Sequence, residues 1–75
     1  MNEANKQRIR ERIGEAGKML EGKLPPTERH PKGRNPYAHI PQVINRLCGA
    51  SYTDLPDDEL PTVLRIIEFC EKNPF

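Results

Sequence analysis

Residues 36–70 read PYAHIPQVINRLCGASYTDLPDDELPTVLRIIEFC and carry two runs of apolar side chains at helical spacing. Asn35-Pro36 is a typical start for the first helix, and Gly49 supplies the left-handed conformation that ends it. We therefore predict a helix over residues 37–48. The apolar positions that define it are Ile40, Val43, Ile44, Leu47 and Cys48.

The second run follows a short connection over residues 51–54, in which Thr53 or Asp54 is expected to cap the next helix. Its apolar positions extend over residues 60–70. The two helices predict a helical hairpin domain over residues 36–75.

The second helix of this hairpin is apolar on more than one stripe. Ile66 and Phe69 lie about a quarter turn or more from the main stripe, so they need a second covering surface. The main stripe, which can face the preceding helix, consists of Leu60, Val63, Ile67 and Cys70.

A narrower apolar stripe lies near the amino terminus, in the segment over residues 1–20. Its side chains recur at steps of four, three and four residues, which predicts an amphipathic basic helix. Gly14 weakens this helix by about 1 kcal/mol relative to alanine, so the segment needs another surface to be stable. The stripe consists of Ile9, Ile13, Ala16 and Leu20.

Residues 21–35, EGKLPPTERHPKGRN, contain three prolines and two glycines and are predicted to be a basic linker. The expected fold is therefore all-α, with an amphipathic N-terminal helix, this linker and the helical hairpin. Each Ile or Phe side chain left in water forgoes about 1.5–3 kcal/mol of burial energy. We expect a homodimer to cover them, and the alternative is a monomeric three-helix fold in which the N-terminal helix folds back.

The length excludes several classes of function. A domain of this size buries only about 60 % of its unfolded surface, which leaves little room for a substrate cleft, so we expect no enzyme and no cofactor. No glycine-rich phosphate loop and no apolar run of about 20 residues is present, so nucleotide chemistry and membrane insertion are not expected.

Two cysteines, Cys48 and Cys70, are predicted to be buried thiols in a reducing cytoplasm, with a disulfide or a metal site as alternatives. A zinc site would need His30 and His39 as well. These spacings match no ordinary zinc finger, so no metal is expected.

Charge is unevenly distributed along the chain. Residues 1–35 hold nine basic and five acidic side chains, whereas residues 36–75 hold three basic and six acidic ones. A basic helix face and arm of this kind can neutralise nucleic-acid phosphates, although interspersed glutamates dilute the charge. The candidate nucleic-acid-binding residues are Arg8, Arg12, Lys23, Arg29, Lys32 and Arg34.

The same segment can instead bind a protein. An amphipathic helix that becomes ordered in a groove of its target would use its apolar stripe as anchors, and the spare apolar residues of the hairpin would add to the contact. The candidate protein-binding residues are Ile9, Ile13, Leu20, Ile66 and Phe69.

Within residues 37–69, the stretch HIPQVINRLCGASYTDLPDDELPTVLRIIEF resembles the short helical module at the carboxy-terminal end of phage antirepressor proteins. In that module a helix, a phrase of the type Gly-x-Ser-Tyr-x-Asp-Leu-Pro and a second apolar helix follow one another. Cys48 stands where the module carries a bulky aromatic residue, and the match does not include the large amino-terminal domain of antirepressors. The matching residues are Leu47, Gly49, Ser51, Tyr52, Asp54, Leu55, Pro56, Leu64, Ile67 and Phe69.

The resemblance implies a phage or prophage origin and a regulatory, DNA-linked context, and it implies no reaction. We therefore expect a small non-enzymatic protein in the cytoplasm of a host bacterium. It would inhibit or regulate a host protein or nucleoprotein complex by stoichiometric binding. The alternative is a DNA-binding transcriptional regulator of the antirepressor type.

Overall fold

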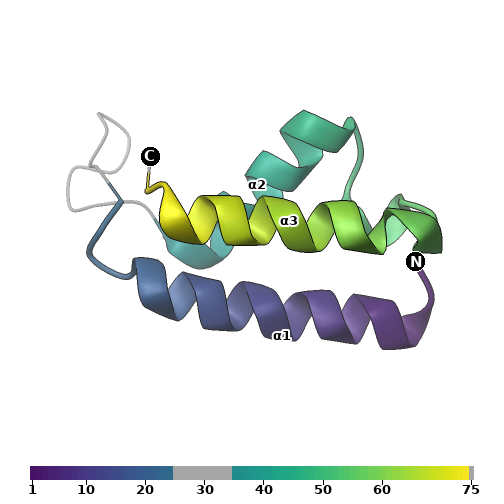
Figure 1. Ribbon diagram of the computed structural model, residues 1–75, viewed down its shortest axis with the longest axis horizontal. Coiled ribbons are helices and arrows are strands. Elements are labelled where there is room, and N and C mark those ends of the chain that lie inside the picture. Colours follow the sequence, from purple (N-terminus) through teal and green to yellow (C-terminus); the bar gives the residue numbers. More distant parts are fainter. Residues whose placement is uncertain (25–34, 75) are drawn as a thin grey trace.

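The computed structural model describes residues 1–24 and 35–74. Within these ranges the chain is helical and has no strand, which confirms the all-α prediction. In Figure 1, α1 and α3 lie side by side and run in the same direction, while α2 passes behind them and returns the chain. The elements are α1 (Glu3–Leu20), α2 (Pro36–Cys48), the 3-10 turns Tyr52–Asp54 and Asp57–Glu59, and α3 (Leu60–Lys72).

Local signals in the sequence fix both ends of α2. The Asn35 side chain accepts a hydrogen bond from the Tyr37 amide at 2.9 Å, and Pro36 occupies the first turn. Gly49 ends the helix with a φ of 75°, in the left-handed region that glycine adopts without strain. The predicted start and stop of this helix are confirmed.

The predicted cap of α3 is wrong. The Ser51 side chain accepts from the Thr53 amide and stabilises the 3-10 turn Tyr52–Asp54 instead. A second 3-10 turn precedes α3, and no side chain caps the helix there. The connection is therefore two tight turns, and the acidic residues of the second turn become available for a contact elsewhere.

The core is a single cluster to which all three helices contribute. It includes every residue of the α1 stripe, so α1 covers the hairpin. Leu24 and Leu55, from the segments that follow α1 and precede α3, close its ends. The helical contributions are Ile9, Ile13, Ala16 and Leu20 from α1, Ile40, Val43 and Ile44 from α2, and Val63, Ile67 and Cys70 from α3.

This core corrects the expectation that the N-terminal helix awaits a partner. The α1 stripe is buried on α2 and α3 of its own chain, as in the monomeric three-helix alternative. The expected linker is also shorter than residues 21–35, because Leu24 is only 6 % exposed and belongs to the core. The remainder of that linker, residues 25–34, lies outside the described residues.

A close approach between α1 and α2 depends on Gly17. A Cβ atom at this position would lie 2.5 Å from Cδ1 and 2.6 Å from Cε1 of Tyr37, so the ring packs directly on the helix backbone. The Tyr37 hydroxyl donates to the Glu21 carboxylate at 2.7 Å, and this bond raises the pKa of Tyr37. The ring is thus held at both its face and its hydroxyl end.

The start of α1 is tied to the turn before α3. Oδ1 of Asp57 accepts hydrogen bonds from the Asn2 amide at 2.6 Å and from Nδ2 of Asn5 at 3.1 Å. The Met1 ammonium donates to the carbonyl of Leu55. The hydrogen bond from Asn2 is the main reason why the pKa of Asp57 lies below its usual value. We call this contact the N-terminal tie.

The tie gives a prediction for pH dependence. Because the folded-state pKa of Asp57 is lowered, its stabilising effect is present above the unfolded-state pKa of about 3.9 and is lost as pH falls through the folded value. We expect wild type to have a higher melting temperature than Asp57→Asn at pH 7, and this difference to disappear near pH 2. Thermal melts by circular dichroism across this range measure it.

Asp58→Asn is the matched control, since the Asp58 side chain makes no hydrogen bond within residues 1–24 and 35–74. If Asp58→Asn lowered the melting temperature at pH 7 as much as Asp57→Asn does, and matched wild type near pH 2, the role of the tie would be contradicted.

No helix in the described ranges combines the length and the apolar character needed to cross a bilayer.

Candidate functional site

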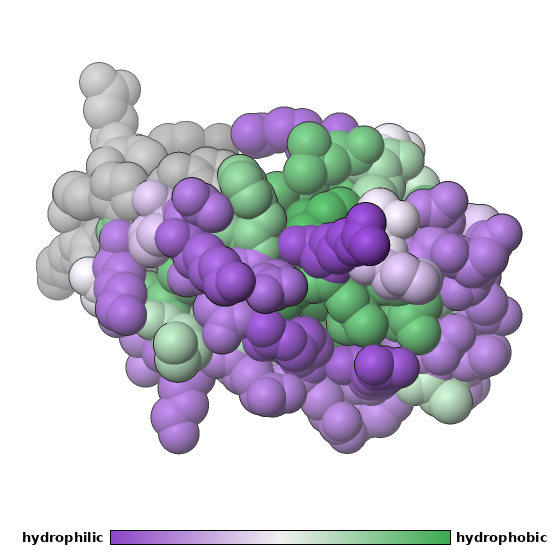
Figure 2. Space-filling view, viewed as in Figure 1, coloured by the Kyte–Doolittle hydropathy of each residue, from purple (hydrophilic) through white to green (hydrophobic). Residues whose placement is uncertain are grey.

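The candidate site consists of apolar side chains of α2 and α3 that the core does not fully cover. Leu47 is 62 % exposed and Phe69 is 52 % exposed, while Ile66 is partly buried against the core. The C-terminal end of α2 rises away from α3 in Figure 1, and Figure 2 shows apolar side chains between the two helices with hydrophilic ones around them. We call Leu47, Ile66 and Phe69 the apolar patch.

Helix geometry explains why these residues stay outside the core. Ile66 and Phe69 are one turn apart on α3 and flank its buried stripe. Leu47 shares the buried side of α2 with Ile40 and Ile44, but it lies in the last turn, where α2 has already diverged from α3. The sequence pattern identified Ile66 and Phe69, and it missed Leu47. Its only signal was the position two residues before the helix stop at Gly49.

The structure contradicts the predicted protein-binding role of three residues. Ile9, Ile13 and Leu20 are 0 %, 7 % and 0 % exposed, so no partner reaches them in the folded chain. Helical periodicity identified correctly which side of α1 is apolar. It did not determine the surface that this side meets, which is the chain's own hairpin.

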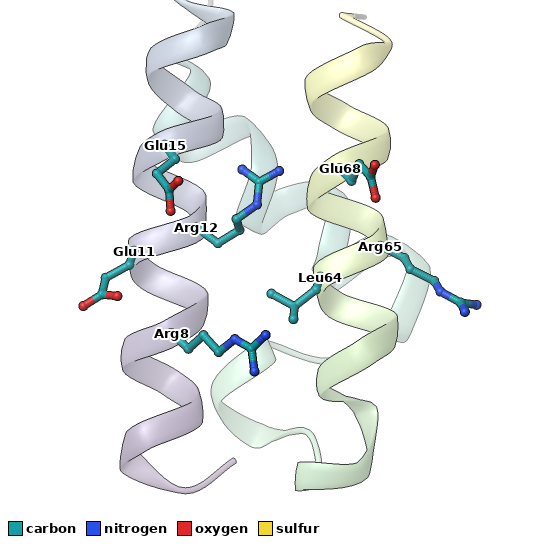
Figure 3. A pocket seen from close by; sticks show the side chains of 7 residues that line it. All are labelled: Arg8, Glu11, Arg12, Glu15, Leu64, Arg65 and Glu68. Atoms are coloured by element: carbon teal, nitrogen blue, oxygen red, sulfur yellow. The ribbon is translucent and has the colours of Figure 1, made fainter.

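A groove of about 310 Å³ lies between α1 and α3. In Figure 3, Arg8 and Arg12 extend from α1 toward α3, Leu64 points into the space between them, and Arg65 points away from α1. The groove is lined by Arg8, Glu11, Arg12, Glu15, Leu64, Arg65 and Glu68. Three arginines and three glutamates balance one another, so the lining carries no net charge.

Arg12, predicted to bind phosphates, is already engaged within the chain. It forms an ion pair with Glu71 of α3, and the two side chains are only 28 % and 18 % exposed. Arg8 has no ion pair within the described ranges, and Lys23 is exposed in the turn after α1. The other predicted phosphate contacts, Arg29, Lys32 and Arg34, lie outside the residues that the structure describes.

The two thiols differ in environment. Cys70 is fully buried, as predicted, and burial raises its pKa, which disfavours the reactive thiolate. Cys48 is partly buried beside Leu47, and the two cysteines are not joined in a disulfide. Within residues 1–24 and 35–74, no three side chains of the metal-binding types come together.

Comparison of the chain with protein-family models, with curated proteins and with solved structures yields no match. The resemblance to the antirepressor module therefore has only the residues quoted above to support it.

Proposed function

We propose that the chain is a non-enzymatic protein of phage type that acts by stoichiometric binding in a bacterial cytoplasm. Its partner is a host protein or nucleoprotein complex, and the apolar patch is the surface that binds it. The patch is the observation that carries the proposal. Burying a Leu or Phe side chain contributes about 1.5–3 kcal/mol, and the three-helix core leaves one such residue more than half exposed on each of α2 and α3.

The resemblance to the antirepressor module supports the same proposal. It supplies the phage and regulatory context, and three of its matching residues coincide with or adjoin the patch, namely Leu47, Gly49 and Phe69. A small surface of this kind typically acts through a few apolar anchors that fill pockets on the partner.

The test is affinity capture from bacterial lysate treated with nuclease, with the wild-type chain compared with the double variant Leu47→Asp/Phe69→Asp. We expect the same protein to be retained by wild type at near-equal molar amounts and to be lost from the double variant. Truncation of central anchors typically weakens binding by 2 kcal/mol or more, about thirtyfold. Retention is quantified by mass spectrometry.

Met19→Asp is the matched control, because Met19 is 54 % exposed but lies on α1, away from the patch. It should retain the partner. Loss of the partner from both variants, or retention by both with their circular dichroism unchanged, would contradict the proposal that the patch is the contact.

Homodimerisation stays a prediction of the proposal. Because α1 covers the core in one chain, a dimer would have to bury exposed side chains such as those of the apolar patch, Met19 and Tyr37. A standard stable interface buries about 800 Å² on each partner, which the three side chains of the patch do not supply alone. Light scattering coupled to gel filtration measures the mass.

The alternative is binding of DNA by the basic residues of α1. Arg8 supports it, since this guanidinium extends over the groove without an ion pair in the described ranges. The engagement of Arg12 with Glu71 weakens it. Fluorescence anisotropy with duplex DNA at low salt separates the two: an affinity weaker than about 100 μM excludes the alternative, because non-specific binders reach about 10⁻⁴–10⁻⁶ M at physiological salt.

A further inference from the structure

We infer that the groove between α1 and α3 is a contact between two copies of this chain, in which α1 of one copy packs antiparallel on α1 of the other. The charges that line the groove carry this inference. The lining does not include Leu47, Ile66 or Phe69, so the inference goes beyond the proposed function and does not depend on the apolar patch.

Two opposite charges in the groove have no partner within residues 1–24 and 35–74. Arg8 and Glu15 both line the groove from α1, and neither side chain forms a hydrogen bond or an ion pair there. They lie two turns apart on one side of the helix, about 10 Å along its axis. In Figure 3, Arg8 extends over the groove toward α3. The groove therefore presents one positive and one negative group that a partner can pair.

The charges along α1 follow an order that becomes its own complement when it is reversed. Positive and negative side chains alternate in the lining as Arg8, Glu11, Arg12 and Glu15. Two antiparallel helices that meet with their midpoint between residues 11 and 12 place Arg8 of each copy opposite Glu15 of the other, and Glu11 opposite Arg12. Every facing pair then joins opposite charges. A parallel packing would join like charges instead, which is unfavourable.

The two central residues keep their contacts within the chain. Arg12 pairs with Glu71, and the Glu11 carboxylate accepts a hydrogen bond from Nε2 of Gln7 at 3.1 Å. A guanidinium has five N–H donors, so Arg12 can bond a second carboxylate without losing the first. We expect the two outer pairs to contribute most, because their members have no competing partner in the described ranges.

Apolar side chains continue the same side of α1 beyond the charged ones. Met19 lies one turn after Glu15, Ala4 lies one turn before Arg8, and both are exposed. The same reversal places Ala4 of one copy opposite Met19 of the other. A second hollow of about 480 Å³ shares Glu15 with the groove and includes Met19, and Leu64 is half-buried in the groove itself. The antiparallel contact would therefore bury apolar groups as well as pair charges.

Other occupants fit this lining less well. Duplex DNA would pair with Arg8, but Glu11 and Glu15 would repel its phosphates. A helix of another protein would need acidic and basic side chains in the reversed order. A second copy of the chain supplies that order by itself.

The experiment is sedimentation equilibrium of the full chain between about 10 μM and about 1 mM, with helicity checked by circular dichroism. Contacts that bury less than about 1,200 Å² in total are typically weak, so we expect a dissociation constant on the order of 10⁻⁴ M. Arg8→Glu and Glu15→Arg each place like charges opposite one another in both outer pairs. Each variant alone should weaken self-association by about tenfold or more. An equimolar mixture of the two variants has opposite charges in both pairs again, and it should form a heterodimer with the affinity of wild type.

Arg10→Glu is the matched control, because Arg10 is exposed on α1 but does not line the groove, and it should leave the affinity unchanged. An increase in salt from about 20 mM to about 300 mM should weaken the wild-type dimer, since salt screens exposed charges.

Three results would overturn the inference: a chain that stays monomeric at about 1 mM, a dimer that Arg8→Glu leaves intact, or two charge variants that do not associate when mixed. Binding of duplex DNA that Arg8→Glu abolishes, without any dimer, would assign the groove to DNA and would overturn it as well. None of these results involves Leu47 or Phe69, so capture of a partner by the apolar patch succeeds or fails separately.

Discussion

Replacement of Ile9 by Asp is expected to unfold the whole chain at 25 °C. Ile9 is fully buried in the cluster that joins all three helices, so the variant would place a carboxylate in an apolar interior without a partner. Such burial costs several kcal/mol, comparable to the total stability of about 4–11 kcal/mol expected for a domain of this length. Far-UV circular dichroism should lose the helical signal of α2 and α3 together with that of α1.

Met19→Asp introduces the same charge on the exposed side of the same helix, and we expect its free energy of unfolding to change by no more than about 0.5 kcal/mol. A comparison of Ile9→Asp with Met19→Asp distinguishes two roles of the α1 stripe: a part of the core, or a surface that only binds partners. If Ile9→Asp kept native amide shifts over residues 36–75, the hairpin would be an independent domain and the three-helix core would be incorrect.

Alanine at Gly17 is expected to destabilise the fold although alanine is the better helix former. The helix preference would contribute about 1 kcal/mol in favour of the variant. The new Cβ would overlap the Tyr37 ring, and displacement of that ring loses its packing and its hydrogen bond to Glu21. Overpacking typically costs about 1–3 kcal/mol, so we expect a net loss of roughly 1–2 kcal/mol in urea denaturation.

Gly14→Ala is the control on the same helix, because a Cβ there has no atom within 4 Å. It should stabilise the chain by about 0.5–1 kcal/mol. Removal of the ring in Tyr37→Ala should turn Gly17→Ala from destabilising to neutral or stabilising, which is a double-mutant cycle for the contact. If both Gly14→Ala and Gly17→Ala stabilised the wild-type chain, the Tyr37 ring would be able to move aside without loss of stability, which contradicts the prediction.

Local signals account for the parts of the fold that the sequence predicted. Asn35, Pro36 and Gly49 act on their own helix ends, so the limits of α2 follow from neighbours in the chain. The apolar spacing of α1 identified its buried side in the same way. Composition and periodicity also predicted a helical fold without strands in the described part of the chain.

The features that the sequence did not predict depend on how the helices meet. Periodicity places Leu47 on the buried side of α2, but the angle at which α2 leaves α3 exposes it. Asp57 accepts a hydrogen bond from the Asn2 amide, 55 positions away in the sequence, and no local pattern indicates this contact. The sequence predicts a phosphate contact for Arg12, whereas its partner in the structure is Glu71, 59 positions away.

The parallel arrangement of α1 and α3 also constrains the order in which native contacts form. The contact between Arg12 and Glu71 closes a segment of 59 positions, and this closure costs roughly 3–4 kcal/mol of loop entropy. α2 reaches α1 and α3 through short connections, residues 21–35 and residues 49–59, so we expect the contacts between α1 and α3 to form last. Until they form, each helix pair exposes apolar side chains that the third helix later covers, and exposed apolar surface favours aggregation.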